Sequence, residues 1–204
     1  MAARYEGGAT EAGFWFESVS FDSSRLPGAV TAEEMQTIGS VARLELTQAF
    51  GGLPIRFSDE REARYRIRVV QQLRDLRLRR FVGVAGESRV ISGIGGQGAV
   101  SFSYIANAAV AFAPAEADRA SLIDAIGRGI GRAAVHEFTH QFLPMAPIHD
   151  SRDIRSYEYA SAARREQYYG DMHWAIARPL LQQRLERRHV SPSAHLDPTG
   201  KETF

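Results

Sequence analysis

The chain has 204 residues, 44% of them apolar, and its 25 lysine and arginine residues nearly balance 24 aspartate and glutamate residues, for a net charge of +1. Length and composition predict one globular domain, and the balanced charge argues against a nucleic-acid-binding protein, whose surface needs a net positive excess. The absence of cysteine excludes disulfides, thiolate metal sites and cysteine nucleophiles, so any metal must bind histidine, aspartate or glutamate.

The sequence has no pattern typical of a targeting or membrane segment. The N-terminal residues lack the basic and then apolar pattern of a signal peptide, and no run approaches the roughly 18 apolar residues that a membrane helix needs. We therefore expect a cytoplasmic protein that does not enter a membrane. Secretion is the alternative for a chain whose leader has been removed. The oligomeric state is left open.

The first predicted elements are a helix and two strands. Residues 31–50 predict a helix, because Thr31 and Glu34 have the spacing of a capping box and apolar residues then recur at helical spacing. Residues 53–59 and 63–71 predict two strands. In the second strand, apolar residues alternate with arginines, which is typical of a strand that is buried on one face.

Three further segments precede the second half of the chain. The basic run at 74–80 is interpreted as a solvated face or loop. The glycines at 93–98 have the spacing of a dinucleotide-binding fingerprint, but that fingerprint requires a following helix. A strand-like segment follows here, so we interpret them as a flexible connection between strands. Residues 99–114 predict a strand or strand pair at the edge of a sheet.

A long helix is predicted over residues 118–143, where apolar residues recur on one face. Three glycines interrupt its middle, and each costs helix stability of about 1 kcal/mol relative to alanine. We therefore expect close packing of this helix against a neighbouring element. The three glycines are Gly127, Gly129 and Gly131.

A proline ends this helix, and the rest of the chain predicts a smaller, mostly helical part. Helical patterns appear at 159–169 and at 177–188. We expect a single domain with an N-terminal lobe over 1–143, a C-terminal lobe over 144–190 and a loose tail over 191–204.

Histidines are concentrated at the end of the long helix, in the sequence HEFTH. His136 and His140 are four residues apart, which places them on neighbouring turns of one helix face, offset by about 40° around the axis. Two imidazoles at this spacing can bind one ion. Glu137 lies where a carboxylate reaches a metal-bound water without itself binding the metal. The pattern predicts a catalytic zinc ion with Glu137 as general base.

A catalytic zinc ion needs a third protein ligand, and two residues compete for this role. His149 lies nine residues beyond His140, after a proline-bounded turn that can bring the chain back toward the metal. Glu158 lies eighteen residues beyond His140, near the start of the next predicted helix. We favour His149 as the third ligand and keep Glu158 as the alternative. Glu166 is a weaker candidate still.

These residues resemble the metzincin family of zinc peptidases, whose motif reads His-Glu-x-x-His-x-x-Gly-x-x-His. The order of predicted elements over roughly residues 31–159 is similar too. The resemblance implies an α+β fold with a twisted mixed sheet, an active-site helix and a small C-terminal lobe. It also implies one zinc ion per chain, held by His136, His140 and His149, and the hydrolysis of peptide bonds in a peptide or protein substrate.

The sequence departs from the family pattern in the turn and beyond it. Leu143 replaces the glycine at which the family's helix ends, although the proline that follows can end the helix instead. Ala146 occupies the family's third-ligand position, so the role of His149 requires three extra residues in the turn. Tyr157 replaces the methionine of the family's turn Ser-x-Met-x-Tyr, whose final tyrosine matches Tyr159. The chain would be an atypical member.

Three functions therefore stay open. The first is a zinc-dependent peptidase; if residues 99–114 form an edge strand, an extended peptide can pair with it near Phe102 and Tyr104. The second is a metal-binding domain without hydrolytic activity, whose cleft binds a partner. The third is a thermolysin-like or aminopeptidase-like (gluzincin-like) peptidase with Glu158 as the third zinc ligand.

Overall fold

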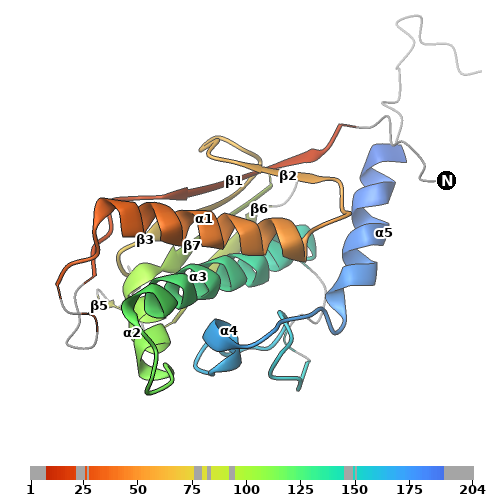
Figure 1. Cartoon of the computed structure of the whole chain (residues 1–204). Coiled ribbons are helices and arrows are strands. Elements are labelled where there is room, and N and C mark those ends of the chain that lie inside the picture. The colour runs from red at the N-terminus through yellow and green to blue at the C-terminus, as the bar shows by residue number, and fades with distance from the viewer. Residues whose placement is uncertain are drawn as a thin grey trace, which may run out of the picture.

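The computed structural model describes residues 8–21, 26, 28–75, 80–81, 84–91, 95–144, 149 and 151–190. Within these residues the chain forms helices, one large sheet and one short two-stranded sheet (Figure 1). The strands are β1 (Thr10–Phe16), β2 (Ile55–Ser58), β3 (Tyr65–Val70), β4 (Arg74–Asp75), β5 (Arg80–Phe81), β6 (Gly86–Ile91) and β7 (Gly95–Ser101). The helices are α1 (Ala32–Ala49), α2 (Phe102–Ala111), α3 (Arg119–Phe142), α4 (Glu166–Tyr169) and α5 (Ala177–Val190). The predicted tail at 191–204 lies outside the described residues, as do 76–79 of the basic run and 92–94 of the glycine-rich stretch.

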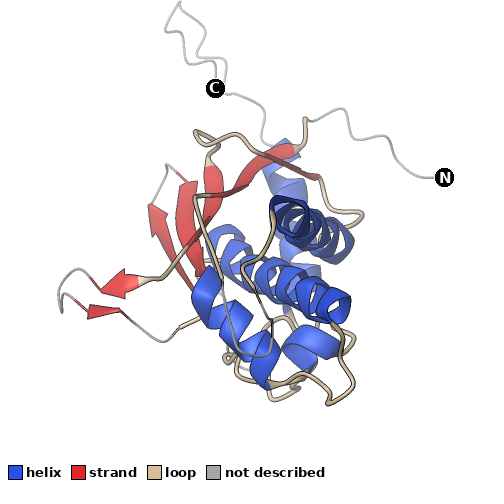
Figure 2. Cartoon of the chain, turned by 60° about the vertical axis from the view of Figure 1, so that its left-hand side comes forward, coloured by secondary structure: helices blue, strands red, loops and turns tan. Residues whose placement is uncertain are grey.

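The large sheet has the strand order β2-β1-β3-β7-β6. Neighbouring strands are parallel from β2 to β7, and β6 runs antiparallel to β7 at one edge. The helices α1 and α3 lie side by side over one face of this sheet (Figure 1 and Figure 2). The mixture of helices with a mostly parallel sheet agrees with the predicted α+β class.

The core lies between the sheet and these helices. In β3 the side chains of Tyr65, Ile67 and Val69 are buried, as the alternation in the sequence predicts. They belong to one apolar cluster with Phe138 and Phe142 of α3. The rings of Tyr65 and Phe142 lie 4.9 Å apart between their centroids. The helix that carries the histidines is thus fixed directly on the sheet.

The N-terminus of α1 has the predicted capping box. The Thr31 hydroxyl accepts a hydrogen bond of 3.2 Å from the Glu34 backbone N–H, and the Glu34 carboxylate accepts one of 2.8 Å from the Thr31 N–H. Two of the N–H groups that are free at a helix start are thereby satisfied. Arg119, the first residue of α3, donates to the same carboxylate. The cap of α1 therefore also positions α3.

The predicted strand over 99–114 is wrong for most of its length. β7 ends at Ser101, and α2 then follows, with the Ser101 hydroxyl accepting a hydrogen bond of 3.4 Å from the Tyr104 N–H at the helix start. An alanine-rich apolar run fits a buried helix as well as a buried strand, and periodicity alone does not separate the two. β7 also lies inside the sheet, between β3 and β6, so the edge strand on this side of the sheet is β6.

Two other expectations are corrected. The glycines at 95–98 belong to β7 and pair with β3 and β6, instead of forming a flexible connection. The helix expected over 159–169 is limited to Glu166–Tyr169. β1, which the sequence analysis did not predict, lies between β2 and β3 in the sheet. β1 has seven residues but no clear alternation of buried and exposed positions, so it leaves little signal in the sequence.

The glycines of α3 permit the expected close packing. A β-carbon on Gly127 would lie 2.7 Å from the β-carbon of Val41, and one on Gly131 would lie 2.6 Å from the carbonyl oxygen of Ala42. Both contacts are with α1, so the two helices approach each other closely along these glycines. Gly129 faces the other way, where a β-carbon would lie 2.6 Å from the ring of Tyr168.

We expect Gly131→Ala to destabilise the protein by about 1–3 kcal/mol, because the new methyl group forces α1 and α3 apart in a packed core. Gly39→Ala in α1 is the matched control. Its β-carbon would meet only the Phe16 ring, at 3.9 Å, and alanine is the better helix former by about 1 kcal/mol. Urea unfolding of both variants tests this, and equal stability changes would contradict it.

The C-terminal part of the chain packs against the end of α1. The Trp174 indole N–H donates to the Ala49 carbonyl oxygen at 2.8 Å, and the Arg178 guanidinium donates to the same oxygen at 3.0 Å. Arg178 also donates to the Gly51 carbonyl oxygen at 2.6 Å. These bonds satisfy carbonyl groups that a helix end leaves free. In the part of the chain that the structure describes, no helix combines the length and apolar character needed to cross a membrane.

Candidate metal centre

Three histidine side chains converge at the C-terminal end of α3. The Nε2 atoms of His136 and His149 lie 3.0 Å apart, those of His140 and His149 also 3.0 Å, and those of His136 and His140 3.2 Å. His149 comes from the segment after α3 and is exposed, whereas His136 and His140 are partly buried. The three residues predicted as metal ligands therefore form one cluster that can hold a metal ion.

The spacing of these nitrogen atoms fits a zinc ion. Zinc–nitrogen bonds of roughly 2.0–2.1 Å at tetrahedral angles place neighbouring nitrogens about 3.3 Å apart. The observed separations of 3.0–3.2 Å are close to this value. Three imidazoles leave the fourth tetrahedral position for water or substrate, which is the arrangement of catalytic zinc sites.

The orientation of His136 is set by the backbone of the turn that follows. Its Nδ1 lies 2.8 Å from the Tyr157 carbonyl oxygen. A carbonyl oxygen only accepts hydrogen bonds, so Nδ1 carries the proton and the Nε2 lone pair is left for a metal. Tyr157 is the residue that replaces the methionine of the family's turn. Its buried side chain packs on Trp174, with the ring centroids 4.9 Å apart.

Burial keeps the two helical histidines in the form that binds metals. It lowers the pKa of His136 to about 4 and that of His140 to about 4, and the neighbouring histidines contribute to both shifts. Both rings are therefore neutral at pH 7. Metal binding requires neutral imidazoles, so no proton has to be displaced from these two ligands near neutral pH.

Glu137 is buried beside the cluster, against the edge strand. Its side chain is 7% exposed, and a β-carbon on Gly86 of β6 would lie 2.6 Å from its Oε1. Burial raises the pKa of Glu137 to about 8, with a further contribution from the Glu87 carboxylate. A nearby dication opposes such a shift, because it stabilises the carboxylate form. A cation on the histidines would thus make Glu137 an effective proton acceptor near neutral pH.

A buried amide fixes the end of α3 on the sheet. The Gln141 side chain accepts a hydrogen bond from the Arg66 N–H at 3.2 Å and donates to the Arg66 carbonyl oxygen at 3.1 Å and the Ser88 hydroxyl at 2.9 Å. A β-carbon on Gly96 would lie 2.5 Å from this side chain. Glu137 and Gln141 therefore face glycines in neighbouring strands. Gln141 was not among the residues predicted from the sequence, although two polar residues four positions apart on a buried helix face, Glu137 and Gln141, are a visible signal.

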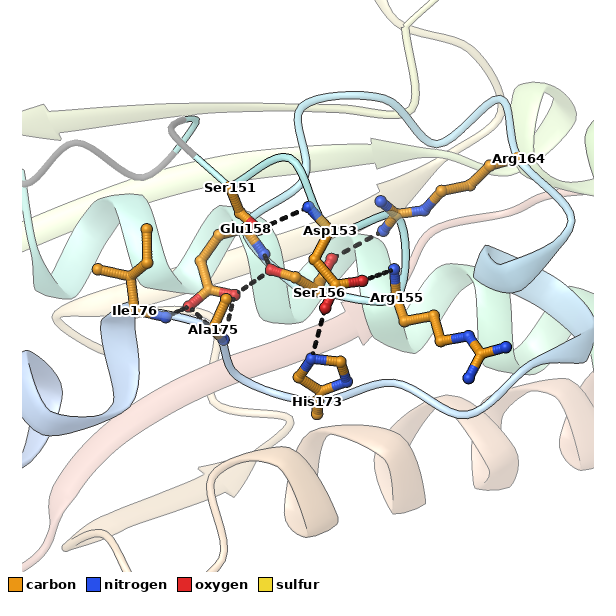
Figure 3. A network of polar contacts seen from close by, with 9 residues as sticks. All are labelled: Ser151, Asp153, Arg155, Ser156, Glu158, Arg164, His173, Ala175 and Ile176. Atoms are coloured by element: carbon orange, nitrogen blue, oxygen red, sulfur yellow. Dashed lines mark hydrogen bonds and ion pairs between the residues drawn. The ribbon is translucent and has the colours of Figure 1, made fainter.

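Glu158, the alternative third ligand, has a different partner. It is fully buried, and its carboxylate accepts hydrogen bonds from the N–H groups of Ala175, Ile176 and Ala177 at 2.6–3.2 Å, at the start of α5. Figure 3 shows the bonds from Ala175 and Ile176. The Ser156 hydroxyl donates to the same carboxylate at 2.5 Å. The side chain thus caps α5. It is not a member of the histidine cluster.

We expect Glu158→Gln to destabilise the fold by about 1–3 kcal/mol, because the amide offers weaker acceptors to N–H groups that stay buried. Asp153→Asn is the control. Asp153 also accepts two hydrogen bonds, from Arg155 and His173, but is exposed to solvent. Loss of its charge is therefore expected to lower the free energy of unfolding by less than about 1 kcal/mol. Thermal unfolding compares the two, and equal losses would contradict the capping role.

The effect of Glu158→Gln depends on pH. Burial alone would raise the pKa of Glu158, but the hydrogen bonds to its carboxylate outweigh burial and hold the pKa below the ordinary value of 4.5. A lowered folded pKa means that the stabilisation is complete above the unfolded pKa and is lost as the pH falls through the folded pKa. The stability difference from the wild type is therefore expected to shrink below about pH 4.5.

The histidine cluster and Glu137 line a cleft of about 710 Å³. β6, α3 and the segment after α3 each contribute residues that line this cleft. Tyr104, from α2, and Tyr159 also line it. Phe102 is fully buried, so the hypothesis that a peptide pairs with 99–114 near this residue is wrong. Arg132 and Arg164, which the sequence analysis did not single out, line the cleft as well.

Comparison with known proteins adds no relative of this chain. No family model, no curated protein and no solved structure matches it.

Proposed function

We propose that the chain is a zinc-dependent metallopeptidase, in which His136, His140 and His149 hold one zinc ion and Glu137 acts as general base. One observation carries the proposal. Three imidazole nitrogens converge at the spacing of a zinc site, and a buried carboxylate lies beside them in a cleft that is open to a substrate. A zinc ion that only stabilised a fold would have no use for this carboxylate.

The chain's own residues supply the proton transfers of peptide hydrolysis. When bound, a zinc ion polarises a carbonyl group and lowers the pKa of a bound water to about 7. Glu137 takes a proton from the attacking water and delivers it to the departing amine nitrogen. Burial of Glu137 between α3 and Gly86 holds its carboxylate in one position. The turn carbonyl of Tyr157 keeps His136 in the tautomer that a metal needs.

We propose a metzincin-like catalytic domain as the form of this peptidase. The mixed sheet, the long helix carrying HEFTH and a third histidine beyond its end support this reading. His149 takes the third position despite the longer turn. The gluzincin-like alternative loses support, because the Glu158 carboxylate is occupied at the start of α5.

Removal of the metal tests the function. Incubation with 1,10-phenanthroline is expected to abolish cleavage of a mixture of quenched fluorescent peptides, and added zinc is expected to restore it, because zinc lowers the pKa of the attacking water. The 1,7-isomer of phenanthroline, which does not chelate, is the control. Full activity in the metal-free protein would exclude a metallopeptidase. A protein that binds zinc but cleaves no peptide would instead be a metal-binding domain without hydrolytic activity.

A further inference from the structure

One buried arginine in the cleft has no carboxylate partner among the described residues. Arg164 is 8% exposed and lines the same cleft as the histidine cluster. Its Nη2 donates to the Ser156 carbonyl oxygen at 3.0 Å and to the Gln167 amide oxygen at 3.0 Å. Its Nε and Nη1 are buried and have no hydrogen-bond partner. The guanidinium therefore keeps two donor nitrogens free.

The other arginine of the cleft shows what is missing at Arg164. Arg132 is 6% exposed, and its guanidinium donates to both oxygens of the Glu45 carboxylate, at 3.0 and 3.1 Å. Burying a charge without a partner costs several kcal/mol, so buried arginines are normally paired in this way. Burial lowers the pKa of Arg164, which reflects the same cost. An anion in the cleft would supply the missing partner.

Arg164 lies close to the histidine cluster. Its guanidinium binds the carbonyl of Ser156, and the ring of His136 binds the carbonyl of Tyr157, the next residue along the same turn (Figure 3 shows the bond from Arg164 to Ser156). The Tyr159 ring lies over the guanidinium, 4.7 Å from its central carbon to the ring centroid, and is only half-buried.

We propose that Arg164 binds a carboxylate of the substrate, next to the bond that is cleaved. This inference rests on the proposed peptidase function and names its substrate class: peptides with an acidic residue beside the scissile bond, or peptides whose C-terminal carboxylate lies there. The charged guanidinium keeps the N–H groups of Nε and Nη1 free, and each can donate a charge-assisted hydrogen bond to a carboxylate oxygen.

The test measures binding separately from hydrolysis. The probes are fluorescein-labelled alanine hexapeptides with one central glutamate or one central glutamine, each made with a free and with an amidated C-terminus. Binding to zinc-loaded Glu137→Gln protein is followed by fluorescence anisotropy, so that the peptides stay intact. If the amidated glutamate peptide binds more tightly than the amidated glutamine peptide, the site binds a side-chain carboxylate. If the glutamine peptide with a free C-terminus binds more tightly than its amidated form, the site binds the terminal carboxylate.

The favoured carboxylate is expected to strengthen binding by about 10- to 100-fold, as hydrogen bonds to a buried charge do. In the same background Arg164→Met is expected to abolish the gain, and Arg165→Met, which removes the neighbouring exposed arginine, is expected to leave it unchanged. If Arg164→Met does not fold, Arg164→Lys takes its place. Lysine keeps the charge but lacks the fixed N–H directions of a planar guanidinium, and it is expected to lose most of the gain.

The outcomes separate the inference from the proposed function. Equal binding of the carboxylate and amide peptides overturns the carboxylate site, as does a gain that survives in folded Arg164→Met. The same peptides are also offered to the wild-type protein. If it binds carboxylates through Arg164 but cleaves no peptide, the carboxylate site stands and the peptidase proposal fails. If the wild type cleaves the carboxylate and amide peptides equally well, the peptidase proposal stands and the carboxylate site fails.

Discussion

Glu137→Gln is expected to lower peptide hydrolysis by about 100- to 10,000-fold, the range in which loss of a general base falls. Glutamine has nearly the same shape as glutamate and fits the space beside Gly86, but it cannot accept the proton of the attacking water. Zinc content is expected to remain at one ion per chain, because Glu137 is not a ligand. Initial rates on one quenched peptide and elemental analysis measure the two quantities.

A matched variant separates the proton transfer from packing. Gly86→Ala leaves the carboxylate in the chain, but its methyl group would lie 2.6 Å from the Glu137 Oε1 and displaces it. We expect a partial loss of hydrolysis in this variant with zinc retained. Unchanged hydrolysis by Glu137→Gln would contradict the proposed role of the carboxylate, whatever Gly86→Ala does.

His149→Ala is expected to weaken zinc binding by at least about 100-fold, since even residues that only orient a ligand contribute 10- to 100-fold to metal affinity. The variant loses the one ligand that comes from outside α3 and leaves two imidazoles, too few for a stable catalytic site. Zinc affinity measured by competition with a chromophoric chelator tests this expectation.

Two controls accompany this experiment. His173→Ala removes a histidine that pairs with Asp153 at 2.8 Å, away from the cluster, and is expected to leave zinc affinity unchanged. Glu158→Gln is expected to keep zinc as well, because that carboxylate binds the start of α5. Loss of zinc in Glu158→Gln alone would restore the glutamate-liganded alternative and remove His149 from the site.

The candidate site was predictable where its geometry is local. His136, Glu137 and His140 are held by one helix, and a helix fixes the relation of residues three and four apart without help from the rest of the chain. The capping box formed by Thr31 and Glu34 is a local feature of the same kind. Their expected positions match the structure for this reason.

Features that depend on distant contacts were harder to predict. The apolar run at 99–114 fits a strand or a helix, and only its packing against α3 in the core decided for α2 over most of its length. β1 has little alternation, and it is a strand because β2 and β3 pair with both of its edges. Gly86 and Glu137 are far apart in the chain, so their contact left no mark in the sequence pattern.

By itself, the sequence predicted a metal site from two imidazoles and a carboxylate at helical spacing, in a chain without cysteine. The tertiary structure decided which residue completes the cluster. Glu158 is occupied by the N–H groups of α5, and His149 approaches His136 and His140 from the segment after α3. Helical spacing is set by backbone hydrogen bonds within a few residues, whereas the third ligand depends on how the chain returns after Pro144.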